Sequence, residues 1–257
     1  MQTVTSSQQF QGQNIFISGG SSGIGLAAAK NFLERGAKRV YISGRDLGKL
    51  QRAQAELGER VVSIHADLTK MEDIQATATM MQQQGESLDV LFANAGIAEN
   101  NTLGATSEAQ FDATFDTNVK GLFFTVQSLL PMMKNEGSII LNASVAANKG
   151  MPNLSLYSAS KAAVRSFART WCNELKDKKI RVNTISPGVT STPILKNGLK
   201  MTEESLQGFK QYLTEAVPLG RMAQAEEIAN VVCFLAASDA SYINGIELCV
   251  DGGFTQI

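Results

Sequence analysis

The sequence contains few of the residues on which metal sites and nucleophilic triads depend. His65 is its only histidine, which removes most zinc sites and most histidine-dependent triads from consideration. The three cysteines, Cys172, Cys233 and Cys249, are odd in number and far apart, with no Cys-x-x-Cys. This pattern is typical of reduced, buried thiols. We therefore expect no metal site.

Long apolar runs and an excess of charge are also missing. The longest apolar run, residues 231–237, is too short to span a bilayer. The first thirteen residues contain no basic stretch leading into an apolar run, so we expect a cytoplasmic protein. The net charge is −1 with neither sign clustered, which argues against nucleic acid and membrane as partners and favours a small neutral or mildly polar molecule.

Length and hydrophobic pattern predict one α/β domain. The 257 residues, 44% of them hydrophobic, can bury one full core, so we expect a single domain over residues 1–257. Short apolar runs predict strands at residues 15–18, 40–43, 61–64, 90–93, 138–141, 181–185 and 245–250. Amphipathic patterns predict helices at about 23–35, 46–57, 70–84, 107–134, 156–177 and 224–236, with a weaker pattern at 202–215. This alternation predicts a Rossmann-type, doubly wound parallel sheet of about seven strands with helices on both faces.

A glycine cluster follows the first predicted strand and opens the first predicted helix. It reads Gly19-Gly20-Ser21-Ser22-Gly23-Ile24-Gly25. Bare backbone there can approach a pyrophosphate, with the amides and the dipole of the helix facing the negative charge. The spacing Gly-x-x-x-Gly-x-Gly differs from the usual Gly-x-Gly-x-x-Gly fingerprint. An ordinary glycine-rich turn is the alternative.

The ends of the second and third predicted strands bear on cofactor choice. A carboxylate is expected after the second strand in an NAD site, but Gly44 and Arg45 stand there. Arg45 can hold a 2′-phosphate, which favours NADP, or it is a solvated loop charge while Asp46 caps the next helix. Asp67, followed by Leu68, can accept from an adenine amine or act as a helix cap.

Tyr157 and Lys161 lie four residues apart, so one helix face carries both side chains. Bringing a phenol from a pKa of about 10 to about 7 needs roughly 4 kcal/mol of preference for the phenolate. One ammonium about 4 Å away supplies about that much at an effective dielectric constant near 20. The pair is therefore a candidate acid/base element.

The order and spacing of six motifs resemble those of the short-chain dehydrogenase/reductase family, in its single-domain branch with Tyr-x-x-x-Lys. The resemblance covers about residues 10–255, and the motifs are the glycine cluster, Asn94-Ala95-Gly96, Asn118, Ser144, Tyr157-x-x-x-Lys161 and Pro187-Gly188. Two departures are Ser18, where Thr is common before the first glycine, and Phe92-Ala93 before Asn94.

The resemblance implies four catalytic residues. Tyr157 is expected to protonate the carbonyl oxygen as hydride arrives, and to act as base in the reverse direction. Lys161 is expected to lower the pKa of Tyr157 and to bond the nicotinamide ribose. Ser144 is expected to donate to the substrate oxygen. Asn118, poorly suited to a helix interior, is expected to anchor a water-linked proton path to the lysine.

The resemblance also implies cofactor contacts along the chain. One stretch is expected beneath the adenine ribose, namely Asn94, Ala95 and Gly96. Another is expected to fix the carboxamide, namely Pro187, Gly188, Val189, Thr190 and Thr192. No basic residue lies between Gly19 and Gly23, so the expected NADP preference depends mainly on Arg45, with help from Ser21 and Ser22, and NAD stays an alternative.

Two further expectations concern residues 187–223 and the assembly. The apolar series within 193–217 predicts either a lid over an apolar pocket or a surface helix packed on the domain. Small residues in the helix 156–177, together with the resemblance, predict a homotetramer. An oxidoreductase acting on a ketone or secondary alcohol is the favoured function, and a non-catalytic dinucleotide-sensing regulator on the same fold is the alternative.

Overall fold

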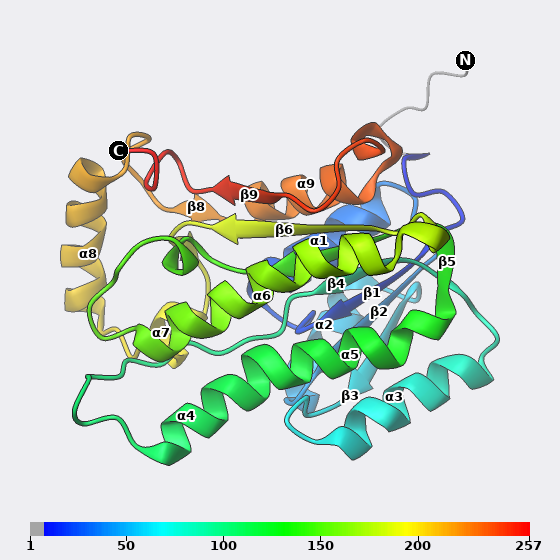
Figure 1. Cartoon of the computed structure of the whole chain (residues 1–257), viewed down its shortest axis with the longest axis horizontal. Coiled ribbons are helices and arrows are strands. Elements are labelled where there is room, and N and C mark those ends of the chain that lie inside the picture. The colour runs from blue at the N-terminus through cyan, green and yellow to red at the C-terminus, as the bar shows by residue number, and fades with distance from the viewer. Residues whose placement is uncertain (1–7) are drawn as a thin grey trace.

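The computed structural model describes residues 8–257 and contains a seven-stranded, wholly parallel sheet. The strand order is β3-β2-β1-β4-β5-β6-β9 (Figure 1). The strands are β1 (Asn14–Ser18), β2 (Arg39–Gly44), β3 (Val61–His65), β4 (Leu88–Ala93), β5 (Met133–Asn142), β6 (Arg181–Pro187) and β9 (Glu247–Val250). The first seven residues of the predicted domain lie outside the described part.

Helices cover both faces of the sheet, as the pattern predicts. Side chains alternate along a strand, so Ile15 and Ile17 pack on one helical layer and Phe16 packs on the other. One layer comprises α1 (Gly23–Glu34), α2 (Leu47–Leu57) and α9 (Ala225–Ala236). The opposite layer comprises α3 (Met71–Gln83), α5 (Leu122–Leu129) and α6 (Ser155–Glu174), with α4 (Glu108–Phe115) leading into α5.

The predicted helix 107–134 is neither uniform nor that long. A π-helical segment, η2 (Asp116–Gly121), joins α4 to α5, and a 3₁₀ turn, η3 (Leu130–Met132), follows α5. Pro131 lies in that turn and cannot donate a helical hydrogen bond, so the chain becomes extended at Met133, where β5 begins. The last predicted strand begins at Glu247 rather than at 245, because Gly245 forms a turn with φ +72°.

The weakly patterned stretch 187–223 contains four short elements. They are β7 (Thr190–Ser191), α7 (Ile194–Asn197), α8 (Glu203–Ala216) and β8 (Ala223–Gln224). The uncertain helix at 202–215 is therefore α8, and the hydroxyl of Thr202 caps it by accepting from the backbone of Ser205. Single 3₁₀ turns complete the described chain at η4 (Val145–Ala147), η5 (Lys176–Lys178) and η6 (Ser238–Ala240).

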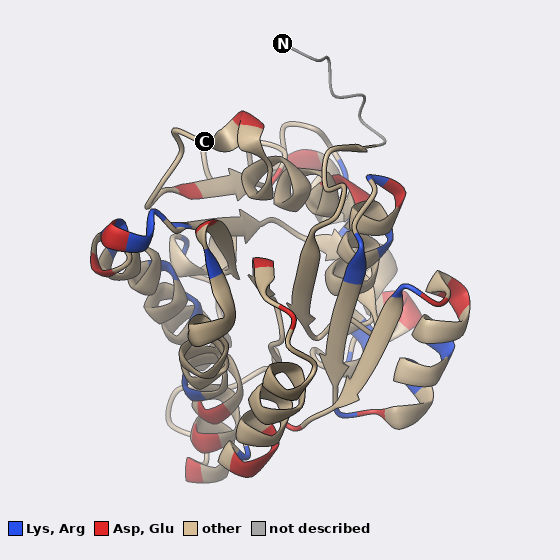
Figure 2. Cartoon of the chain, turned by 90° about the vertical axis from the view of Figure 1, so that its right-hand side faces the viewer, with Lys and Arg blue, Asp and Glu red and all other residues tan. Residues whose placement is uncertain are grey.

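Charged residues lie mainly on the helices and at the strand ends, and most of each strand is free of charge (Figure 2). Two apolar cores therefore form, one on each face of the sheet. Among the described helices, none has the length and apolar character that crossing a membrane would require.

Candidate active site

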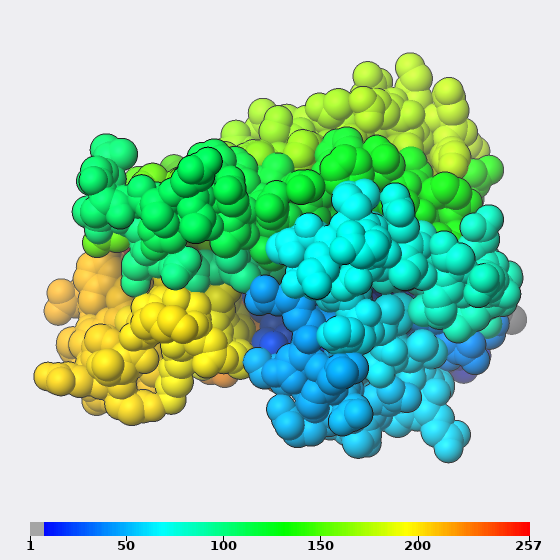
Figure 3. All heavy atoms as spheres, turned by 90° about the horizontal axis from the view of Figure 1, so that it is seen from below, coloured from blue at the N-terminus to red at the C-terminus, as the bar shows by residue number. Residues whose placement is uncertain are grey.

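A cavity of about 500 Å³ opens at the carboxyl ends of the strands. Seen from below, yellow atoms of the α7–α8 region and blue atoms around α2 border a hollow with darker blue, N-terminal atoms at its base (Figure 3). The cavity brings most predicted site residues together, namely Gly19, Ser21, Ser22, Gly23, Ile24, Arg45, Asp67, Leu68, Asn94, Ala95, Gly96, Ser144, Tyr157, Lys161, Pro187, Gly188, Val189, Thr190 and Thr192. Gly25 and Asn118 lie behind this lining.

The N-terminus of α1 has the properties of an anion site. Within residues 8–257, the N-cap residue Ser22 makes no side-chain hydrogen bond to the helix. The first turn of α1 contains no acidic residue. Gly19 and Gly23 have φ angles of +67° and +54°, which favour glycine. A Cβ on Gly25 would lie 2.2 Å from the carbonyl oxygen of Gly19, so the turn requires a glycine there. These features fit a pyrophosphate held by backbone amides.

Side-chain hydrogen bonds join the ends of β1, β4 and β5. The Ser18 hydroxyl accepts from the backbone amides of Asn94 (3.0 Å) and Ala95 (3.1 Å). The side-chain Nδ2 of Asn94 donates to the carbonyls of Ser18 (3.0 Å) and Gly19 (3.1 Å). The side-chain Oδ1 of Asn94 accepts from Asn142 Nδ2 (2.8 Å). Ser18 and Asn142 were missed by the sequence interpretation, although both stand at predicted strand ends beside predicted site residues.

Two acidic residues, Asp46 and Asp67, line the cavity at the ends of β2 and β3. Asp46 caps α2 by accepting from the backbone of Lys49 at 2.9 Å, as the alternative interpretation predicts. The Asp67 carboxylate accepts from the backbone and the hydroxyl of Thr69. Burial acts to raise the pKa of Asp67, but these bonds and the charge of Arg45 outweigh it and lower the pKa. Arg45 is exposed and lines the cavity, free to meet a ligand at its rim.

Tyr157 and Lys161 project from α6 toward the end of β5. The Lys161 ammonium lies 5.7 Å from the centre of the Tyr157 ring and donates to the Asn142 carbonyl at 2.7 Å. The Lys161 residue is 4% exposed, and burial lowers its pKa to about 8. Ser144, two residues beyond Asn142, caps η4 by accepting from the backbone of Ala146 at 3.2 Å. The three predicted chemical groups therefore share one wall.

The pKa of Tyr157 moves opposite to the prediction. Burial raises it, and only hydrogen bonding with Ser144 acts to lower it. The expected lowering by Lys161 is absent among the interactions of the described residues. The phenol is therefore protonated near pH 7 and can act as a proton donor.

Asn118 lies fully buried in the π-helical segment and supports the cavity from behind. Its Oδ1 accepts from the backbone of Ile97 (2.8 Å), and its Nδ2 donates to the Ile97 carbonyl (2.9 Å) and to Ser160 Oγ (3.0 Å). The Ser160 hydroxyl in turn donates to the Tyr157 carbonyl at 2.7 Å. The Asn118 side chain thus joins the segment that follows β4 to α6. Its part in a proton path stays a prediction.

Gly96 is tightly enclosed between Lys161 on α6 and Asn118. A Cβ built on Gly96 would lie 3.1 Å from Asn118 Oδ1 and 3.2 Å from Lys161 Nζ. Both distances are shorter than ordinary van der Waals contact. A larger residue would therefore displace the ammonium or the Asn118 side chain, which explains why glycine stands at this position.

Asn101 fixes the start of α6, a role that the sequence interpretation missed. It is 5% exposed, and its Oδ1 accepts from the backbone of Leu156 at 3.1 Å. Its Nδ2 donates to the hydroxyls of Thr106 and Ser155, both at 3.0 Å. Because α6 has no cap from its own N-cap residue within the described chain, Asn101 supplies an acceptor one residue before Tyr157. Its partners lie up to 55 residues away, so no local pattern reveals this.

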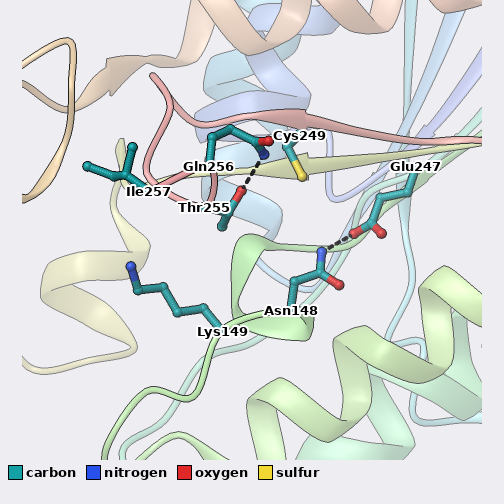
Figure 4. A pocket seen from close by; sticks show the side chains of 7 residues that line it. All are labelled: Asn148, Lys149, Glu247, Cys249, Thr255, Gln256 and Ile257. Carbon is teal, nitrogen blue, oxygen red and sulfur yellow. Dashed lines mark hydrogen bonds between the residues drawn. The ribbon is translucent and has the colours of Figure 1, made fainter.

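A second hollow of about 330 Å³ lies near the C-terminus (Figure 4). It is lined by Asn148, Lys149, Glu247, Cys249, Thr255, Gln256 and Ile257. Asn148 donates to Glu247 at 2.6 Å, and the Lys149 ammonium lies 4.1 Å from the centre of the Phe254 ring. Its polar groups are engaged with one another, and of the described residues none lines both this hollow and the large cavity.

A family model described as "Enoyl-(Acyl carrier protein) reductase" matches residues 19–255, nearly the whole chain. The chain belongs to the short-chain dehydrogenase/reductase family. It is therefore an oxidoreductase of this family on a Rossmann-like fold, as the motifs predict.

Three members of the short-chain dehydrogenase/reductase family illustrate the similarity. Oxidoreductase asL5 of Sarocladium schorii is 42% identical over 252 residues, which cover 97% of this chain and 98% of that protein. A short-chain dehydrogenase/reductase (glucose/ribitol dehydrogenase) structure from Brucella melitensis has a TM-score of 0.89 at 31% identity, covering 96% and 98% of the two chains. A 3-ketoacyl-(acyl-carrier-protein) reductase from the same organism, complexed with NADH, has a TM-score of 0.86 at 30% identity, covering 96% and 99%.

Replacing Asn101 with Ala should lower kcat more than it weakens cofactor binding. The change leaves the Leu156 amide without its acceptor and loosens the turn that carries Tyr157, at a cost of about 1–3 kcal/mol in stability. Steady-state kinetics and denaturant unfolding measure both effects. Asn101→Asp, which keeps the Oδ1 acceptor, should recover part of the rate, and Asn173→Ala on the exposed side of α6 should behave as wild type. Equal losses in the Ala and Asp variants would contradict the capping role.

Replacing Lys161 with Met should change how stability depends on pH. A pKa of about 8 in the folded protein against 10.5 unfolded means that the buried ammonium destabilises the fold by roughly 3 kcal/mol below pH 8. Wild type should therefore gain stability relative to Lys161→Met as pH rises from 8 toward 10.5, when the charge is lost. Unfolding free energies measured across this range test it, with Lys176→Met as an exposed control. Parallel curves for wild type and Lys161→Met would refute it.

Proposed function

We propose that this protein transfers a hydride between NADP(H) and a ketone or secondary alcohol, with Tyr157 as general acid and base. The supporting observation is the shared wall on which Ser144, Tyr157 and Lys161 meet at one end of the cavity. The other end offers the uncapped N-terminus of α1 to a phosphate. A protein that binds a dinucleotide without catalysing a reaction requires only the N-terminus of α1 and not the wall with Ser144, Tyr157 and Lys161.

In the reduction direction the residues have distinct tasks. The protonated phenol of Tyr157 donates its proton to the carbonyl oxygen, and the Ser144 hydroxyl donates a hydrogen bond to the same oxygen as negative charge develops there. Lys161 then faces the phenolate that remains, with its ammonium 5.7 Å from the ring centre. In the oxidation direction the phenolate takes the alcohol proton. The dinucleotide supplies or accepts the hydride.

The residues of the cavity fit a dinucleotide along its whole length. The glycine turn fits the pyrophosphate, Asn94, Ala95 and Gly96 would lie beneath the adenine ribose, and Lys161 would bond the nicotinamide ribose. A Cβ on Gly23 would lie 3.3 Å from the Thr192 side chain, so the 187–192 turn closes over the glycine turn. A Cβ on Gly188 would lie 2.7 Å from the Asp251 backbone, which pins this turn in place.

Charge at the adenosine end favours NADP(H) over NAD(H). Arg45 and Lys49 both line the cavity there. The carboxylate of Asp46 caps α2 and lies 3.8 Å from the Lys49 ammonium, so it is already engaged. A 2′-phosphate would meet two cations, whereas a ribose hydroxyl would lack the dedicated carboxylate of an NAD site. A structural neighbour was crystallised with NADH, so NAD(H) stays the alternative cofactor.

The segment 187–223 is proposed to act as a lid. Leu195, Leu199 and Phe209 line the cavity, while Leu213 packs on the domain beside Val217. The two interpretations left open by the sequence therefore describe opposite sides of one segment. Closing over substrate would exclude water from the Tyr157 hydroxyl.

The homotetramer and the cytoplasmic location expected from the sequence stay predictions. Phe111 on α4 is 47% exposed and stacks on Phe115 at 4.5 Å, so an apolar patch is available on α4. Such a patch is compatible with association through this helix.

Replacing Tyr157 with Phe should reduce turnover by about a thousandfold while NADPH still binds, because the variant loses only the transferable proton. NADPH oxidation with a panel of ketones measures turnover, and cofactor fluorescence measures binding. Tyr242→Phe is the matched control, since Tyr242 is fully exposed. Turnover that is unchanged in Tyr157→Phe would refute the assignment, and absence of turnover in wild type on every ketone would favour the dinucleotide-sensing regulator.

Replacing Arg45 with Gln should weaken the binding of NADPH and leave the binding of NADH nearly unchanged. A charge-assisted bond of roughly 1.5–3 kcal/mol corresponds to a rise of about ten- to a hundredfold in the KM for NADPH. Paired kinetics with both cofactors measure the ratio. Arg52→Gln removes one positive charge from α2, at a residue outside the cavity lining. This variant therefore controls for long-range electrostatics. A preference of wild type for NADH would overturn the role of Arg45.

A further inference from the structure

Apart from Lys161, the charged residues that line the cavity are gathered at one end. Arg45 and Asp67 follow β2 and β3, whereas Ser144 follows β5. Two strands, β1 and β4, separate β2 from β5 in the sheet. Three strand spacings of about 4.8 Å place the two ends roughly 14 Å apart. The charges that would hold a phosphate therefore lie far from the reacting carbonyl.

An apolar wall surrounds the catalytic end instead. Val145, adjacent to Ser144, belongs to a cluster with Leu195, and Met151, Leu199 and Phe209 pack against it. All five of these side chains also line the cavity. They come from the loop after β5 and from the α7–α8 segment, so they face the substrate position from two sides.

Among the described residues that line the cavity, Lys161 is the only cation at the catalytic end. Its ammonium is bonded to the Asn142 carbonyl at 2.7 Å and lies beside the Tyr157 ring, where the proposed function requires it. Asn197 is exposed at the rim and offers a neutral amide. A negatively charged group beyond the reacting carbonyl would be desolvated against Val145, Met151 and Phe209 without a counter-charge.

We infer that the substrate is an uncharged ketone whose flanking groups are apolar, with at most a neutral oxygen such as an ester carbonyl reaching the Asn197 amide. This inference depends on the proposed function, since it names the substrate class of the same site. It excludes keto acids as good substrates.

Two matched pairs of ketones that differ only in charge provide the test. Ethyl 3-oxobutanoate is compared with 3-oxobutanoate, and 4-phenylbutan-2-one with its para-carboxylate, each by NADPH oxidation at pH 7. The neutral member should have a kcat/KM at least about a hundredfold higher in both pairs. A difference below about a hundredfold in either pair would overturn the substrate class while leaving the oxidoreductase standing. Failure of all four ketones and of a wider panel would overturn the proposed function and this inference with it.

Adding a charge to the apolar wall tests its position. Leu199→Arg should raise kcat/KM for 3-oxobutanoate at least tenfold relative to wild type and lower that for the ester, because it supplies the missing counter-charge. Leu103→Arg, at a residue 91% exposed and outside the cavity lining, should change neither. Equal effects of the two variants would show that this wall does not contact the substrate. The wild-type comparison of ketones decides the substrate class even where a variant fails to fold.

Discussion

The hydrogen bond between the Lys161 ammonium and the Asn142 carbonyl is the interaction on which the rest of the site depends. Asn142 is the last residue of β5, so the sheet itself fixes the acceptor. The bond holds a buried charge that lowers the stability of the fold, because desolvation brings the lysine pKa to about 8. The protein retains this cost beside Tyr157. A neutral side chain there would improve the fold and remove the ammonium that lies beside the phenol.

The same residue links the catalytic end to the phosphate end. Asn142 donates through its side chain to Asn94, and Asn94 donates to the carbonyls of Ser18 and Gly19. Three neighbouring strands, β1, β4 and β5, are thereby joined at their carboxyl ends by side chains as well as by the ladder. The spacing between the glycine turn and the acid/base pair is therefore set by the strand spacing of the sheet. A loop could not hold two ends of an extended cofactor at a constant separation.

The sequence predicts the fold and about half of the cavity lining because the relevant signals are local. Apolar runs mark the strands, and the glycine turn and the Tyr-x-x-x-Lys spacing each lie within one element or turn. Asn101 could not be predicted, since its partner Leu156 is 55 residues away. The direction of the Tyr157 pKa was predicted wrongly because the spacing shows that an ammonium is near and does not show how deeply the phenol is buried, and burial raises the pKa. The π-helical segment around Asn118 was missed because the hydrophobic period hardly changes across one extra residue per turn.

The separation of charge from apolar surface in the cavity follows from strand order. β2 and β3 lie on the far side of β1, so the cations at their ends cannot reach the carbonyl end beyond β4. The apolar wall comes instead from segments outside the sheet, with Met151 in the loop before α6, Leu199 after α7 and Phe209 on α8. The groups proposed to move the proton are therefore held by β5 and α6, while the groups proposed to contact the flanks of the substrate are carried by connections. Substitutions in those connections can change the shape of the apolar wall without disturbing Tyr157, because the wall that carries Tyr157 takes its geometry from β5 and α6.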